Sequence, residues 1–82
     1  MDKSIETAVK DFILREFLPG ENADELTEAT PLITGGILDS LATLKLVAFL
    51  EDHYSVTLRA HEADVENLNT LADIGSLVRS KL

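Results

Sequence analysis

The chain has 82 residues, which is enough for one small domain with a single modest core. It contains no cysteine, and this excludes disulfides, thiolate metal sites and chemistry by a thiol of its own. The formal net charge of −8 at pH 7 disfavours nucleic acid and anionic membranes as partners, and it favours basic patches on other proteins. The first residues lack an apolar signal core and no apolar run approaches a membrane span, so we expect a cytoplasmic protein.

A first helix is predicted to begin at Ser4 and to end before Pro19-Gly20. Its apolar residues recur at helical spacing on one stripe, namely Ile5, Ala8, Val9, Phe12, Ile13 and Phe17. Its charged residues take the opposite side, namely Glu6, Lys10, Asp11 and Arg15. We therefore interpret this helix as a core element without chemistry.

A long connection is predicted from Leu18 to Leu38. Loops of this length are uncommon in compact domains unless side chains attach them to the core. The apolar residues that we expect to make this attachment are Leu26, Pro31, Leu32 and Ile33.

The stretch Gly35-Gly36-Ile37-Leu38-Asp39-Ser40-Leu41 passes from turn residues to helix formers at Asp39-Ser40. Asp and Ser are favoured at a helix start because their oxygens accept from backbone N–H groups that the first turn leaves unpaired. A helix start also favours a phosphate group. Taken alone, the pair is most simply interpreted as a helix cap. In its context, Ser40 is also a hydroxyl placed to carry a phosphodiester.

The second helix, predicted over 40–53, is apolar on two faces. One stripe consists of Thr43, Leu46, Val47 and Leu50, and the other of Leu41, Leu44 and Ala48. Full burial of such a helix is difficult in a domain of this size, so the second stripe predicts a docking face beside Ser40. Glu51 and Asp52 end the helix with negative charge, which a basic partner would match, although solubility explains it equally well.

The remaining chain predicts an extended link around Val56 and Leu58, a short helical turn within 62–67, and a last helix that starts at Thr70. Thr70 and Asp73 have the spacing of a capping box. The core stripe of the last helix is Leu71, Ile74, Leu77 and Val78, with Gly75 among them allowing a close helix approach. The expected fold class is all-α, a small bundle of three main helices plus one short helix, with a long first loop.

The tripeptide Asp39-Ser40-Leu41, the glycines before it, its mid-chain position, the acidic balance and the length together resemble the acyl carrier protein family over residues 5–82. The string 67–74 also resembles the segment that opens the last helix of carrier domains. In that family the serine of an Asp-Ser-Leu motif carries 4′-phosphopantetheine, whose thiol holds an acyl group as a thioester. The resemblance implies one carrier domain over 1–82, with Ser40 as the attachment point, Asp39 and Leu41 flanking it, and no catalytic residue or metal.

The resemblance also implies partners for a free-standing monomeric carrier. These are a phosphopantetheinyl transferase, a ligase or transferase that loads the acyl or aminoacyl group, and downstream synthase enzymes with basic docking patches. The residues that we expect to contact them are Leu41, Leu44, Lys45, Ala48 and Glu51.

Three positions depart from the pattern of fatty-acid carriers. Those carriers usually have a glycine three residues before the serine and acidic residues two and five after it, where this chain has Ile37, Ala42 and Lys45. The arrangement looks more like D-alanyl carriers and other specialised stand-alone carriers. It implies a specialised fatty-acid or polyketide-like pathway, with an aminoacyl or D-alanyl carrier loaded by an adenylating ligase as the alternative.

An alternative from another class is an acidic helical adaptor that binds a partner through Leu41, Leu44 and Ala48 without modification. Enzyme chemistry has less support. His53 and His61 do not have a zinc-site spacing, and nothing supplies an oxyanion hole for a triad of Ser40 and His53.

Overall fold

A computed structural model describes residues 4–18, 20 and 26–82, and over these residues the chain is helical without strands. The helices are α1 (Ser4–Phe17), α2 (Ser40–Tyr54), α3 (Val65–Leu68) and α4 (Leu71–Lys81). The predicted all-α class, with three main helices, one short helix and a long first loop, is confirmed.

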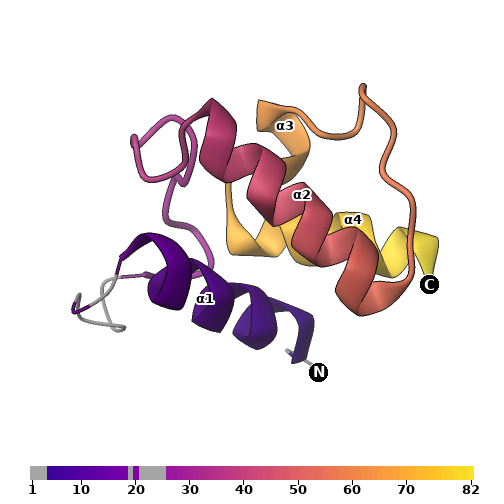
Figure 1. The fold of residues 1–82 in the computed structure, drawn as a ribbon, viewed down its shortest axis with the longest axis horizontal. Coiled ribbons are helices and arrows are strands. Elements are labelled where there is room, and N and C mark those ends of the chain that lie inside the picture. The colour runs from indigo at the N-terminus through magenta and orange to yellow at the C-terminus, as the bar shows by residue number, and fades with distance from the viewer. Residues whose placement is uncertain (1–3, 19, 21–25) are drawn as a thin grey trace.

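The three long helices surround one apolar core. Figure 1 shows α2 lying between α1 and α3, with α4 passing behind it in this view. α4 contacts both α1 and α3. The side chains with almost no exposed surface come from all four helices and the first loop, namely Val9, Ile13, Leu32, Leu46, Leu50, Leu68, Leu71, Ile74 and Val78. The predicted core stripe of the last helix is confirmed in full, and in α1 the half-buried Ala8 and Phe17 flank the buried part of the stripe.

Glu6 departs from the predicted pattern of α1. We expected it on the solvent side, but it is 5% exposed and its carboxylate accepts two hydrogen bonds from Arg79 of α4. The distances are 2.6 Å from Nη1 to Oε2 and 2.7 Å from Nη2 to Oε1. Gly75 explains the burial, because a Cβ at this position would overlap the Glu6 carboxylate. The expected close approach at Gly75 therefore accommodates an ion pair between α1 and α4.

The first loop is attached to the core as predicted at Leu26 and Leu32, which are buried, and at Ile33, which is half-buried. The expectation for Pro31 was wrong, because this residue is exposed. Its backbone carbonyl lies against Gly35, where any Cβ would collide with it. Pro31 therefore belongs to a tight turn at the surface, and the attachment to the core falls to its apolar neighbours.

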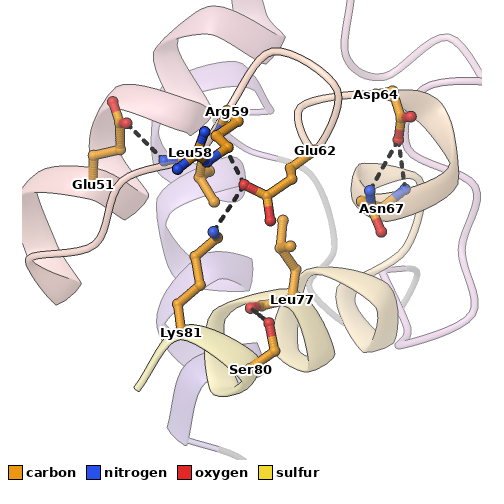
Figure 2. Close-up of polar contacts among 9 residues, drawn as sticks. All are labelled: Glu51, Leu58, Arg59, Glu62, Asp64, Asn67, Leu77, Ser80 and Lys81. Carbon is orange, nitrogen blue, oxygen red and sulfur yellow. Dashed lines mark hydrogen bonds and ion pairs between the residues drawn. The ribbon is translucent and has the colours of Figure 1, made fainter.

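Two carboxylates hold the link between α2 and α3, as Figure 2 shows. Glu51 Oε2 accepts a hydrogen bond of 2.9 Å from the Leu58 backbone N–H. Glu62 Oε1 accepts one of 3.0 Å from the Arg59 backbone N–H and lies 2.8 Å from Lys81 Nζ of α4. The predicted extended link around Leu58 is confirmed, and these contacts attach it to α2 and α4.

The Glu62 contacts predict an acid-dependent loss of stability. The ion pair with Lys81, helped by the Arg59 backbone N–H, holds the pKa of Glu62 below its ordinary value of 4.5. The unfolded chain then binds more protons than the folded chain as pH falls through this range, so the stabilisation present above pH 4.5 is lost on acidification. We expect Glu62→Gln to lower the unfolding midpoint at neutral pH, with a smaller difference from the natural protein in acid. A difference that stays constant across the pH series would contradict this role.

Candidate functional site

The loop before α2 closes on itself and delivers Asp39 and Ser40 to the helix start. The Leu38 N–H donates to the Leu32 carbonyl at 2.8 Å, and the Gly36 N–H donates to the Ile33 carbonyl at 3.1 Å. Gly36 has a φ of 84°, a left-handed conformation that is least strained for glycine. The glycine pair seen in the sequence therefore shapes this closed loop.

Asp39 is the helix cap, and Ser40 is the first residue of the helix. The Asp39 carboxylate accepts from the Ala42 N–H at 2.7 Å, and its carbonyl accepts from the Thr43 N–H at 2.9 Å and the Thr43 hydroxyl at 2.8 Å. Asp39 is thus committed to the backbone of α2. Ser40 is exposed beside it, at the end of the helix that carries partial positive charge.

A surface groove of about 620 Å³ opens directly beside Ser40. Its lining consists of Ile33, Leu38, Asp39, Ser40, Thr43, Leu44 and Ala63. These residues come from the first loop, the start of α2 and the segment before α3, so the tertiary structure brings three distant parts of the chain together. The walls are mostly apolar, and Ser40 is itself one of the lining residues. Sequence analysis did not identify Ile33, Leu38 or Ala63 as part of a site.

A second hollow, of about 310 Å³, is lined by α2 residues near Ser40 and by the end of α1. Its lining consists of Glu16, Phe17, Ile37, Asp39, Leu41, Ala42 and Lys45. Unlike the groove, it carries charges of both signs. The helix start is therefore flanked by an apolar groove and by a more polar hollow.

α2 presents the predicted second stripe to solvent. Leu41 is 63% exposed and Leu44 is 65% exposed, while Ala48 and Lys45 are exposed on the same helix. The opposite side buries Ala42, Leu46 and Leu50. The two-faced character that the sequence predicted is present, and the docking role of the exposed face stays a prediction. Glu51 differs from the other predicted docking residues, because it is half-buried and its carboxylate holds the Leu58 N–H.

Asn69, between α3 and α4, is a site-supporting residue that the sequence analysis did not single out. Its side-chain oxygen accepts from the Ile33 N–H at 2.9 Å and from the Thr34 N–H at 3.0 Å. Its backbone carbonyl accepts from the Leu32 N–H at 2.5 Å. An asparagine outside a helix often satisfies loop amides in this way, but sequence does not indicate which distant loop it holds.

No group of His, Asp or Glu side chains within 4–18, 20 and 26–82 is arranged to hold a metal ion. None of the helices in that part of the chain combines the length and the apolar character that crossing a membrane requires.

Comparison with known proteins identifies a structural relative. No protein-family model matches the sequence, and no curated protein matches it. A solved structure described as "Crystal structure of FAD-dependent dehydrogenase" contains a chain that superposes on this one with a TM-score of 0.76 and 36% sequence identity. The alignment covers 85% of this chain and 97% of that chain.

The coverage also gives the size of the related chain. Since 85% of 82 residues is about 70, and these residues are 97% of the other chain, that chain has about 72 residues. The part of this chain that the structure describes is helical and contains no doubly wound parallel sheet of the kind that binds dinucleotides. With 36% identity over nearly the whole of its relative, this protein belongs to the same family of small helical domains as that chain.

Proposed function

We propose that this protein is a carrier that holds acyl intermediates as thioesters on a 4′-phosphopantetheine arm attached to Ser40. It presents them to separate biosynthetic enzymes of a specialised pathway and is not itself an enzyme. The observation that carries the proposal is the division of roles at the start of α2. Asp39 caps the helix, and the adjacent Ser40 of the Asp-Ser-Leu motif is exposed beside an apolar groove.

The attachment site fits the arm in three respects. Ser40 is accessible, and the first turn of a 15-residue helix favours the negative charge of a phosphodiester. The groove offers apolar walls to a chain that starts at Ser40. When attached, the arm supplies the thiol that this cysteine-free chain lacks.

Modification requires a phosphopantetheinyl transferase. The Ser40 hydroxyl attacks the pyrophosphate of coenzyme A, forming a phosphodiester and releasing the adenosine bisphosphate half. In this proposal the transferase supplies the general base and the metal, while the Asp39 carboxylate next to Ser40 continues to cap the helix by accepting from the Ala42 N–H. A ligase or transferase then loads the acyl group, and synthase enzymes receive it from a monomeric cytoplasmic carrier.

An aminoacyl or D-alanyl carrier is the second candidate. Lys45 is exposed where fatty-acid carriers have an acid, and it shares a charged hollow with Glu16 near the attachment point. A polar or charged cargo suits this hollow better than the apolar groove. Loading of the modified protein by an adenylating ligase with ATP and D-alanine, compared with loading by an acyl transferase, decides between the two.

The structural relative suggests one enzyme partner. The described residues of this chain form helices, and the name of the structural relative makes an FAD-dependent dehydrogenase a candidate partner for the proposed carrier. If such an enzyme oxidised a carried acyl chain, the thioester carbonyl would acidify the proton on the α carbon, and the flavin would supply the acceptor for the hydride from the β carbon. We expect acyl groups bound to the carrier to bleach the flavin absorbance of such an enzyme. If no loaded form of this carrier bleaches the flavin, the enzyme is not a partner.

The intact mass of the protein tests the main proposal. After incubation with coenzyme A, magnesium and a phosphopantetheinyl transferase, a carrier gains the mass of one arm. An adaptor that binds through Leu41, Leu44 and Ala48 without modification gains nothing. Failure with several transferases of broad specificity, on protein shown to be folded, would favour the adaptor.

Charge on α2 is expected to bias partner choice. A basic patch on a fatty-acid enzyme would meet Lys45 as a like charge, an effect usually below about 1 kcal/mol for an exposed pair. Lys45→Glu should therefore speed malonyl transfer by a fatty-acid transferase at low salt, with a gain that fades as salt is added. Leu44→Ala should weaken docking at every salt concentration, since its contribution is apolar. An unchanged rate for Lys45→Glu at low salt would show that this residue does not select partners.

A further inference from the structure

Three consecutive residues of the first loop are held by one residue of another segment. Asn69 accepts backbone hydrogen bonds from Leu32, Ile33 and Thr34, and its Nδ2 donates to Thr34 Oγ1 at 3.2 Å. The two N–H donors that meet its side-chain oxygen determine the orientation of the amide. The cluster joins positions that lie 35 to 37 residues apart in the sequence.

The segment held by Asn69 is the one that ends at the attachment point. The loop closes through the hydrogen bond from the Leu38 N–H to the Leu32 carbonyl, and Asp39 and Ser40 follow directly. Ile33, whose N–H Asn69 binds, also forms a wall of the groove beside Ser40. Loss of the Asn69 side chain would therefore release the Ile33 and Thr34 amides, which belong to the groove wall and to the loop that leads to the serine, while the Asn69 backbone carbonyl would still hold the Leu32 N–H.

We propose that Asn69 is a positioning residue, which fixes the loop 32–38 and thereby presents Ser40 and its groove to the modifying enzyme. The first part of the proposal, that Asn69 fixes the loop, concerns the loop alone. The second part, that it presents Ser40 to the modifying enzyme, rests on the proposed carrier function. Asn69 makes no contact with the reacting atoms and acts through the Ile33 and Thr34 amides.

The chain offers matched variants for a test. Asn69→Ala removes the side-chain acceptor, whereas Asn69→Asp keeps an oxygen for both amides. Thr34→Val removes only the hydroxyl contact and leaves both backbone N–H bonds to Asn69. Val78→Ala shortens a fully buried core side chain of α4 without removing a hydrogen bond to the loop, and it controls for a general loss of stability.

Amide hydrogen exchange tests the first part on the unmodified protein. In Asn69→Ala, we expect Ile33 and Thr34 to exchange about tenfold faster or more relative to the core amide of Leu50, as loss of a hydrogen bond with local opening predicts. In Asn69→Asp and Thr34→Val, the ratio of the loop amides to Leu50 should stay near that of the natural protein. In Val78→Ala the ratio should not rise, because loss of core stability speeds exchange of Leu50 through global opening, whereas the loop amides exchange through local opening. An unchanged ratio of loop to Leu50 exchange in Asn69→Ala, or an equal increase in Val78→Ala, would overturn the proposal that Asn69 fixes the loop.

Transferase kinetics test the second part. If the closed loop is only partly populated, the apparent affinity of the transferase falls by that fraction, while the bound complex reacts normally. Asn69→Ala should therefore raise KM several-fold with kcat little changed, and Asn69→Asp should restore KM. If Ile33 and Thr34 exchange fast in Asn69→Ala but KM is unchanged, Asn69 does not position Ser40 for the transferase. If even the natural protein accepts no arm, the proposed function fails, and the exchange ratios still decide whether Asn69 holds the loop.

Discussion

Replacing Ser40 with alanine is expected to abolish attachment of phosphopantetheine completely, because the proposed bond forms at the Ser40 hydroxyl. The same change should leave the fold almost untouched. The structure assigns the capping hydrogen bond to Asp39, and Ser40 is an exposed first helical residue, where alanine is the better helix former by about 0.5 kcal/mol. Activity and stability therefore separate at this position, which makes the variant informative.

The measurement is the intact mass of each variant after incubation with coenzyme A and a transferase, alongside a urea unfolding curve. Ser76→Ala is the matched control, since Ser76 is also exposed on a helix but lies in α4, outside the groove and hollow at the start of α2. It should gain one arm as the natural protein does. A mass gain in Ser40→Ala would show that the arm is attached at another residue, and the assignment of Ser40 would be wrong.

A second expected result is that alanine destabilises the protein at Gly75, the reverse of its usual effect when it replaces a helical glycine. Alanine is normally favoured over glycine inside a helix by about 1 kcal/mol. Here a Cβ on residue 75 would overlap the Glu6 carboxylate and lie 3.0 Å from Arg79 Nη1. The Glu6 side chain must then move, and its two hydrogen bonds with Arg79 break, each worth roughly 1.5–3 kcal/mol for charged partners. We expect Gly75→Ala to lower the free energy of unfolding by about 2 kcal/mol.

The double-mutant cycle with Glu6→Ala isolates the cause. Without the carboxylate, the added methyl group has space, and the side chain of Arg79, already 40% exposed, can turn to water. In that background Gly75→Ala should stabilise the protein by up to about 1 kcal/mol. Urea unfolding curves with the same dependence of free energy on urea concentration give the free energies of unfolding of the four proteins in the cycle. A destabilising Gly75→Ala in both backgrounds would show that a different neighbour restricts this position.

Local patterns predicted the helical elements well. The apolar spacing of Ile5, Val9 and Ile13 in α1 and the pair Thr70 and Asp73 at the start of α4 act over one or two helical turns, so the sequence contains all the information they need. The same holds for the exposed stripe of α2, which follows from a helix that is apolar on two faces in a domain with one small core. The exposed serine that we propose as the attachment residue was also picked out locally, through a short motif at a helix start.

Long-range contacts decided the rest, because periodicity does not state which distant groups meet. Glu6 was expected in solvent, and only the packing of α4 brought Arg79 and Gly75 against it. The capping role fell to Asp39 and left Ser40 exposed once the loop 32–38 had set the direction of entry. That loop is held by Asn69, and the groove beside Ser40 joins Ile33, Leu44 and Ala63 from three segments. The sequence by itself determined the helices and the serine, whereas the tertiary structure decided the surroundings of that serine, since hydrogen bonds between distant segments exist only after the core has formed.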